Sequence, residues 1–569
     1  MAPHDERQGR ETRPRKSGPA AELAAVEALA RAGRVDEAIR QCAAIVAREG
    51  NSADAHALLG MLRLQSGNAA AAVASMTQAV RLAPASPMHA CRLGIALQGM
   101  GRRGEAIEAY RRSVELGPRW LEGWCRLAAA CEAAEQWADA SGAYERALEL
   151  APDSPEIMTN LAMTRLSRRD FAGSASLLET VVSKKPALQE AWNGLGVAYK
   201  GLNRLEEAIR ALGRALELKP GDPDLLCNLG NCHMGLLDDR GALQCYRRAQ
   251  ELSPGFPAAV FAESICLLAL GDYPDGFAKY ESRWDSVQKL SRRTLPGLRW
   301  DGTQALEGRT ILVLHEQGLG DTLQFMRFAV PLADRGANVV LEVQPPLLEL
   351  ARSMDPRVTV VATKQYPPAW DYYCPMLSLP LHLGMDLGSV PAPAAYLWPD
   401  PALASAWAAR VADAPGLRVG LVASGNPNHK NDHNRSIPLA ALEPVFAGLG
   451  TSVFLVQKEV SAADRATLAA GSTVRELSPQ LTDFSQTAAA VAAMDVVVTV
   501  DTSVAHLSGA LGRPTFVLLP YYPDWRWLLR RSDSPWYPSV RLFRQAAPGT
   551  WSEALASLRE ALAGLAYRR

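Results

Sequence analysis

The first segment with residues suited to chemistry is HEQGLGDTLQF, residues 315 to 325, directly after a run of β-forming residues. Its glycines permit a tight turn, and a helix beginning at Asp321 or Thr322 would point backbone N–H groups into a cleft. His315, Glu316 and Asp321 are candidates for a general base, which must reach the hydroxyl that it deprotonates. The structural alternative is that Asp321 is simply the N-cap of this helix.

A second segment, SGNPNHKNDHNRS at residues 424 to 436, also follows a β-run. It contains four asparagines, two histidines, one lysine and one arginine, and its only hydrophobic side chain is the proline. So many hydrogen-bond donors at the end of a strand suit an anionic ligand such as a diphosphate, with Arg435 and Lys430 as charge partners. A solvated surface turn is the alternative, and the density of donors favours the ligand.

The third segment, DVVVTVDTSVAHLSGALGRPTFVLLP at residues 495 to 520, reads as strand, helix, strand. Asp501, Thr502 and Ser503 are capping residues at the start of the helix, where unpaired N–H groups are available to a phosphate. His506 lies among small and apolar residues, which suit a buried structural histidine almost as well as a ligand contact.

Aromatic and basic residues are concentrated in the fourth segment, PYYPDWRWLLRRSDSPWYPSVRLFRQ at residues 520 to 545. It holds three tryptophans, three tyrosines and five arginines. Aromatic faces can stack on a sugar or a base and arginine pairs with phosphate, so this composition favours a mixed role in binding and in the core.

The first half of the chain carries an internal repeat of 34 residues. Small residues recur at fixed offsets before the prolines that mark the period, which are Pro84, Pro118, Pro152, Pro186, Pro220 and Pro254. Small residues let two antiparallel helices approach closely, and a proline ends the second helix because it lacks an N–H. The pattern resembles the tetratricopeptide repeat over about residues 53 to 256, with a degenerate unit before it and a weakened unit from Pro257 to about Ser286. Such arrays usually grip a peptide or protein on their concave face, and a rigid spacer is the alternative.

After about residue 290, short β-branched runs alternate with amphipathic segments, as in parallel sheets built from βαβ units. We therefore expect an α-solenoid followed by an α/β region of two Rossmann-like halves. The expected domains are a disordered N-terminus (1–18), the repeat superhelix (19–290) and the two halves (291–395 and 396–569). Ligands of such folds bind at the carboxyl ends of strands, where the four segments above lie.

The overall composition is that of a soluble protein, with 48% hydrophobic and 21% charged residues. Sixty basic and sixty acidic side chains leave no net charge, which argues against nucleic acid as a partner. The nine cysteines are scattered and fit a reducing cytoplasm better than a disulfide framework or a metal site. No segment reaches the roughly 18 apolar residues of a membrane helix. We expect a cytoplasmic location, no metal and no cofactor.

The α/β region resembles the heptosyltransferase-like glycosyltransferases of family 9 over about residues 300 to 565. The motif VDTSVAHLSGALGRP, residues 500 to 514, and the turn GLGD, residues 318 to 321, are similar to the motifs of that family. A bacterial subgroup with preceding tetratricopeptide repeats shares EQGLGD, GNPxHxND, DTxxAHLxGALGxP and PDWRWL. The resemblance implies a GT-B fold that needs no metal, with a nucleotide-diphosphate sugar in the C-terminal half and an acceptor in the N-terminal half.

Roles for individual residues follow from this resemblance. Asp321 is the implied base, with Glu316, Gln317 and Gly320 on the acceptor side. The implied donor-binding residues are Asn426, His429, Asn431, Arg435, Asp501, Thr502, Ser503, His506, Asp524 and Arg526.

Three functions compete at this stage. The leading one is transfer of a sugar to a hydroxyl on a protein or cell-envelope glycan presented by the repeats, since a repeat array before the catalytic fold is similar to protein O-GlcNAc transferases. The second is a non-catalytic repeat adaptor with a degenerate GT-B domain. The third, a hydrolase or epimerase on the same frame, has no distinguishing residue in its favour.

Overall fold

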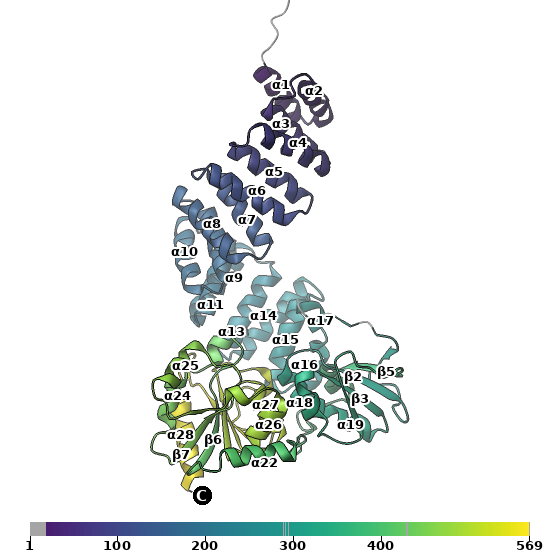
Figure 1. Cartoon of the computed structure of the whole chain (residues 1–569), viewed down its shortest axis with the longest axis vertical. Coiled ribbons are helices and arrows are strands. Elements are labelled where there is room, and N and C mark those ends of the chain that lie inside the picture. The colour runs from purple at the N-terminus through teal and green to yellow at the C-terminus, as the bar shows by residue number, and fades with distance from the viewer. Residues whose placement is uncertain (1–18, 288–289, 291, 294, 428–430, 568–569) are drawn as a thin grey trace, which may run out of the picture. The chain divides into compact units, whose positions relative to one another are not determined.

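The structure is a computed structural model that describes residues 19–287, 290, 292–293, 295–427 and 431–567 (Figure 1). It divides into two compact units, Met1–Leu202 and Asn203–Arg569. Among the helices of the described residues, none combines the length and the apolar character needed to cross a membrane. All nine cysteines are free thiols, and all but Cys125 are buried, as expected from their scattered positions.

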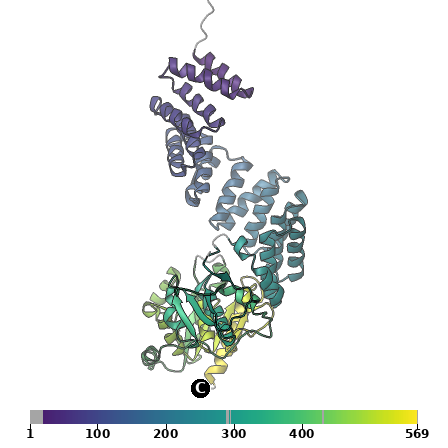
Figure 2. The ribbon, with the colours of Figure 1, turned by 90° about the vertical axis from the view of Figure 1, so that its right-hand side faces the viewer.

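The first unit consists of helices that pair in sequence order, as the turned view in Figure 2 shows. They are α1 (Pro19–Arg31), α2 (Val35–Arg48), α3 (Ala53–Gln65), α4 (Ala69–Leu82), α5 (Pro87–Gly99), α6 (Arg103–Leu116), α7 (Leu121–Ala133), α8 (Trp137–Leu150), α9 (Pro155–Ser167), α10 (Phe171–Lys184) and α11 (Gln189–Gly201).

The 34-residue period has the physical basis expected from the sequence. Each of the six periodic prolines follows the C-cap of a second helix, as Pro84 does after α4. The small residue of the first helix is required by contact, because a Cβ on Gly94 would lie 2.6 Å from the ring of Tyr110. The tetratricopeptide interpretation is therefore confirmed at the level of helix pairs, including the degenerate first pair, α1 and α2.

The second unit opens with further helices of the same kind. They are α12 (Leu205–Leu218), α13 (Pro223–Gly235), α14 (Asp239–Leu252), α15 (Pro257–Leu270), α16 (Tyr273–Tyr280) and the short α17 (Arg283–Ser286). Here too a Cβ on Gly230 would lie 2.5 Å from the ring of Tyr246.

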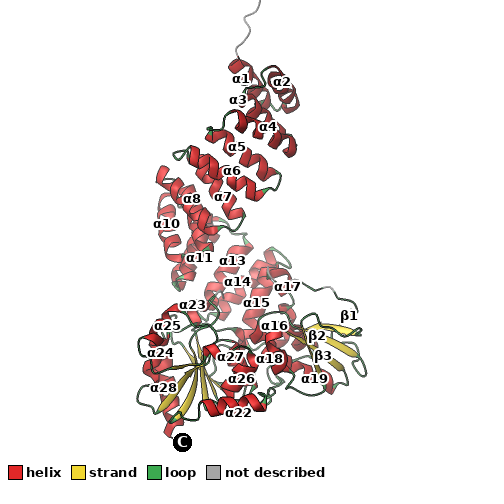
Figure 3. Cartoon of the chain, in the orientation of Figure 1, coloured by secondary structure: helices red, strands yellow, loops and turns green. Residues whose placement is uncertain are grey.

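Two parallel sheets follow, drawn in yellow in Figure 3. The five-stranded sheet has the order β1-β5-β2-β3-β4, with β1 (Leu298–Arg299), β2 (Thr310–Leu314), β3 (Asn338–Val343), β4 (Val358–Ala362) and β5 (Tyr372–Pro375). The six-stranded sheet has the order β11-β10-β9-β6-β7-β8, with β6 (Leu417–Val422), β7 (Thr451–Leu455), β8 (Arg475–Glu476), β9 (Val496–Val500), β10 (Thr515–Leu519) and β11 (Val540–Arg544). Two all-parallel sheets are consistent with the two Rossmann-like halves.

Helices cover these sheets. Those of the N-terminal half are α18 (Leu319–Phe325), α19 (Ala329–Asp334), α20 (Leu348–Ala351) and α21 (Leu379–His382). Those of the C-terminal half are α22 (Pro401–Arg410), α23 (Asp432–Arg435), α24 (Leu439–Phe446), α25 (Ala462–Ala469), α26 (Phe484–Ala492), α27 (Ser503–Ala510) and α28 (Ser552–Tyr567). Strand β9 shows the layering, because Val496, Val498 and Val500 pack with α24 and α28 whereas Val497 packs with α26 and α27.

The last repeats share one hydrophobic core with both halves. Tyr273 and Phe277 of α16 lie in the same cluster as Phe325 after β2 and the tryptophans after β10. The ring of Tyr273 is 5.7 Å from that of Trp536, and the ring of Phe277 is 5.7 Å from that of Trp525. The side chains of Trp525, Trp527 and Trp536 are thus buried. Trp525 and Trp536 form the seat of the last repeat, that is, the apolar surface on which Tyr273 and Phe277 pack. This packing is the core part of the mixed role expected for residues 520 to 545.

The compact units divide inside the repeat array, at 202/203. The last helix of the repeats, α17, ends at Ser286, and the first strand, β1, begins at Leu298. The β-branched runs that alternate with amphipathic segments after residue 290 form β2, β3, β4 and β6 to β11. The short strands β1 and β5 were not predicted. They lie side by side and place β5 between β1 and β2.

We predict that the fragment 203–569 folds and that the fragment 291–569 does not. The shorter fragment exposes the seat formed by Trp525 and Trp536, and burial of each large apolar side chain stabilises a fold by roughly 2 kcal/mol. Calorimetric unfolding and gel filtration should show one cooperative transition for 203–569 and aggregation for 291–569. A soluble 291–569 fragment with the melting temperature of the longer one would contradict this division.

Candidate functional site

The predicted site residues are carried by loops at the carboxyl ends of strands in both sheets. Asp321 lies in the first turn of α18, after β2. Arg435 lies in α23, after β6. Asp501 directly follows β9, and Asp524 and Arg526 follow β10.

An ion pair joins the predicted base to the predicted donor-binding residues. Arg526 Nη2 donates to Asp321 Oδ1 at 2.5 Å, although the two residues are 205 positions apart. Arg526 Nη1 also donates to Asp524 Oδ1 at 2.9 Å. The arginine is 9% exposed and Asp321 is 19% exposed, so this pair is largely shielded from water. The structure thus brings together residues of two separate sequence segments.

Asp321 has a structural role as well. Its Oδ2 accepts the backbone N–H of Gly318 at 2.8 Å, which closes the first turn of α18. The helix begins earlier than expected, at Leu319 with Gly318 as its N-cap, so the prediction that Asp321 is the N-cap is wrong. Asp321 instead accepts the N–H of that N-cap from the third helical position, and this role coexists with the ion pair to Arg526.

Gly320 lets the starts of α18 and α27 come into contact. A Cβ on Gly320 would lie 3.1 Å from His506 Cδ2 and 3.4 Å from Ser503 Cα. Because His506 and Ser503 belong to the other half, a side chain at position 320 would require the neighbouring half to shift by a few tenths of an ångström at the site.

His506 is held as a neutral, buried ring. Its Nδ1 is 3.0 Å from the hydroxyl of Tyr537, and its ring stacks on Trp527 at a centroid distance of 5.2 Å. Burial lowers the pKa of His506 to about 3, and the charge of Arg526 acts in the same direction. This environment favours the orienting role for His506, with its ring fixed beside the start of α27.

Asp501 is an acid whose charge is disfavoured. Burial raises its pKa to about 6, and the carboxylate of Asp524 adds to the rise against the charges of Arg435 and Arg526. Thr502 is the N-cap of α27, but its side chain accepts no hydrogen bond from the first turn. Its hydroxyl lies 3.2 Å from that of Thr499 instead. The start of α27 therefore lacks a side-chain cap.

The loop after β6 approaches the same place through Arg435. Arg435 Nη1 donates to the carbonyl of Asp501 at 2.7 Å, and its Nε donates to Asp432 at 3.2 Å. A Cβ on Gly425 would lie 2.4 Å from the guanidinium, so a glycine is needed where Arg435 crosses the loop.

The other predicted residues of this loop differ in position. Asn431 accepts from Asn434 Nδ2 at 2.7 Å, and Asn434 in turn accepts from Asn203 of the repeats at 2.7 Å. Asn426 is exposed. His429 and Lys430 lie outside the described residues.

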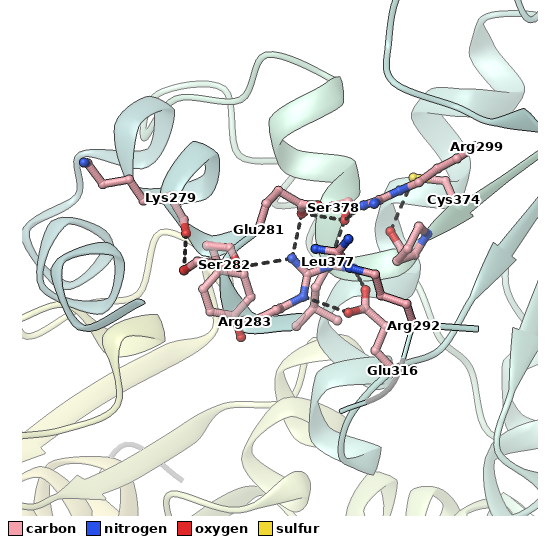
Figure 4. A network of polar contacts seen from close by, with 12 residues as sticks. Lys279, Glu281, Ser282, Arg283, Arg292, Arg299, Glu316, Cys374, Leu377 and Ser378 are labelled. Carbon is pink, nitrogen blue, oxygen red and sulfur yellow. Dashed lines mark hydrogen bonds and ion pairs between the residues drawn. The ribbon is translucent and has the colours of Figure 1, made fainter. Parts of the chain in front are cut away.

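On the acceptor side, Glu316 is buried in a polar network where the last repeat meets the first sheet (Figure 4). Arg283 of α17 donates through Nε to Glu316 Oε2 at 2.9 Å, and the Leu377 N–H donates to Glu316 Oε1 at 2.8 Å. The Glu316 side chain is 3% exposed. This geometry favours a structural role for Glu316 over the predicted acceptor contact.

The remaining nitrogens of Arg283 complete the network. Nη1 donates to Glu281 at 2.6 Å, and Nη2 donates to Ser378 at 2.8 Å. Sequence reasoning missed Arg283 because nothing distinguishes it from other charged residues at the end of a repeat.

Gln317, the other acceptor-side candidate, contacts the repeats as well. Its Nε2 donates to the hydroxyl of Tyr280 at 3.1 Å. Burial raises the pKa of Tyr280, whereas the charges of Arg526 and Arg283 lower it. The last repeat therefore reaches the surroundings of Arg526, a proximity that the repeat pattern alone does not indicate.

Comparison with known families matches both parts of the chain. Residues 447–532 match Glycosyltransferase family 9 (heptosyltransferase). Residues 23–87, 90–119, 126–164 and 190–222 match tetratricopeptide repeats. One chain thus carries segments that match tetratricopeptide repeats and, after them, a segment that matches glycosyltransferase family 9.

Individual proteins are also similar to parts of this chain. Protein FlbA of Caulobacter vibrioides is 27% identical in an alignment of 326 residues that covers 53% of this chain and 54% of that protein. The chain thus spans about half the length of this curated relative. A solved structure of the C-terminal part of a repeat-containing protein from Cytophaga hutchinsonii has a TM-score of 0.37 and 14% identity, covering 42% of this chain and 98% of that one. MamA from Desulfovibrio magneticus has a TM-score of 0.29 and 20% identity, covering 30% and 96%.

We predict that Arg283→Met lowers the free energy of unfolding of the 203–569 unit by about 3 kcal/mol, because it leaves Glu316 buried without its cation. Arg299→Met is the matched control, since Arg299 pairs with the same Glu281 at 2.6 Å but is 35% exposed. The control should cost about 1 kcal/mol or less. Equal losses in urea titrations of the two variants would contradict the structural role assigned to Arg283.

We also predict that Asp501→Asn removes a pH dependence of stability. An acid with a raised pKa in the folded state binds its proton more tightly there, so stability falls as pH rises from about 4 to about 6. The difference in unfolding free energy between the variant and the wild type should therefore shift in favour of the variant from pH 4 to pH 7, by on the order of 2 kcal/mol. Unfolding titrations at both pH values measure this shift. A variant that gains equally at both pH values would exclude this explanation.

Proposed function

We propose that the chain transfers a sugar from a nucleotide-diphosphate sugar to an acceptor hydroxyl, in a metal-independent GT-B arrangement. The observation that carries this proposal is the ion pair between Asp321 of one half and Arg526 of the other, at the carboxyl ends of β2 and β10. Such a transfer needs a carboxylate to accept the hydroxyl proton and cations to stabilise the leaving diphosphate. Here the carboxylate comes from one half and the cations from the other.

The donor would bind in the C-terminal half. Arg526 and Arg435 supply positive charge, and the uncapped start of α27 offers backbone N–H groups. The acceptor oxygen attacks the anomeric carbon while the bond to the diphosphate oxygen breaks, so the diphosphate leaves with the electron pair. Asp321 accepts the hydroxyl proton.

The repeats would present the acceptor, on a protein or a cell-envelope glycan, in the cytoplasm. The contact of Gln317 with Tyr280 supports this part of the proposal, because it places the last repeat beside the acceptor-side loop. Two polar side chains on first helices of the repeats form hydrogen bonds within the array. Trp192 donates to the Pro186 carbonyl at 2.9 Å, and Asn231 accepts from Tyr246 at 2.9 Å.

We predict that the protein binds at least one of ADP, GDP, CDP and UDP in calorimetric titrations. Arg435→Met should weaken that binding by about tenfold, the effect of removing one charge-assisted contact. Arg465→Met is the control, an exposed arginine of α25 in the same half. Loss of transfer in Asp321→Asn with binding retained would support the enzyme. No binding to any of the four would favour the non-catalytic adaptor.

A further inference from the structure

Asp321 is not free to act as a base in the arrangement seen here. Each of its carboxylate oxygens already accepts a hydrogen bond, Oδ1 from Arg526 and Oδ2 from the Gly318 N–H. The Gly318 bond belongs to the helix cap, so it persists as long as α18 is folded. Only the bond from Arg526 can be given up without unfolding local structure.

Arg526 is held by more hydrogen bonds to Asp524 than to Asp321, so the contact with Asp321 is the one that can be exchanged. Its Nη1 is tied to Asp524, whose carboxylate also accepts the Arg526 backbone N–H at 3.0 Å. The contact with Asp321 is a single end-on bond rather than a bidentate pair, which is the weaker geometry. The flat face of the guanidinium lies over the ring of Trp525, 4.5 Å from its centroid.

One nitrogen of Arg526 lacks an acceptor. Within the described residues, the buried Nε makes no hydrogen bond. A buried donor without an acceptor is unfavourable, and an incoming anion would relieve this cost.

We infer that Arg526 exchanges Asp321 for the donor diphosphate, and that this exchange releases the base. In the free protein the guanidinium holds Asp321 Oδ1. A diphosphate at the start of α27 carries more negative charge than one carboxylate and attracts the guanidinium away, while Asp524 keeps the arginine in place. Asp321 Oδ1 then accepts the acceptor proton. The inference rests on the proposed function. It adds an order of binding, because the donor has to bind before Asp321 is available as the base.

Nucleoside diphosphate affinity tests this exchange without knowledge of the acceptor. ADP, GDP, CDP and UDP are titrated into the full chain as wild type, Asp321→Asn, Arg526→Met and the double variant. The asparagine keeps an oxygen to accept the Gly318 N–H, and thermal unfolding checks that each variant is folded. If Asp321 competes for Arg526, Asp321→Asn binds the diphosphate about three- to tenfold more tightly than wild type.

The double variant separates the exchange from simple charge repulsion. Removal of a negative charge near an anion also tightens binding without Arg526, and that gain would persist in the Arg526→Met background. We expect Arg526→Met to weaken binding by about tenfold and Asp321→Asn to add no gain to it. Unchanged or weaker binding by Asp321→Asn, or a gain that survives in the double variant, overturns the exchange while the proposed function stands. A wild type that binds none of the four diphosphates overturns both.

Discussion

The buried pair of Arg283 and Glu316 joins the last repeat to the first sheet, and the arrangement of the second unit depends on it. Glu316 is 3% exposed and the Arg283 side chain is fully buried, so neither charge can be satisfied by water if the other is lost. The pair fixes α17 against the loop that leads from β2 into α18. Because Asp321 lies in the first turn of α18, the position of the candidate base is coupled to the repeats through this loop.

The charged groups of the candidate site differ from the Arg283–Glu316 pair, because they are only partly matched to one another. Arg526 shares two carboxylates that belong to different halves, and Asp501 close by has a raised pKa because it is buried near Asp524. His506 stays neutral beside them. Two titratable groups of the site, Asp501 and His506, are thus shifted toward their neutral forms. An anionic ligand would find the two arginines there already shared with the carboxylates of Asp321, Asp524 and Asp432.

Much of the fold could be predicted from the sequence because its signals are local. The prolines and small residues of the repeats act within one helix pair, and valine-rich runs such as the one that forms β9 are characteristic of buried parallel strands. The edge strand β1 has two residues and β5 has four, too few for a pattern to stand out. The division at 202/203 was not predictable, since Tyr273 and Phe277 look like ordinary repeat residues until Trp525 and Trp536 are found against them.

The site could be predicted only in its parts. Asp321, Arg435, Asp501 and Arg526 were each singled out from their own segment. Their pairing required the fold, because a contact over 205 positions leaves no trace in local spacing. The pairing of Glu316 was not predictable for the same reason, since its partner Arg283 lies in the repeats.

The last repeats contact both halves of the α/β region, and this limits how the region can move. Asn203 bonds to Asn434 and Asp239 pairs with Arg530 in the C-terminal half, whereas Arg283 holds Glu316 in the N-terminal half. Rotation of one half against the other has to stretch at least one of these contacts. Residues 203–286 therefore link the two halves directly. A displacement of these repeats would act on both sheets at once.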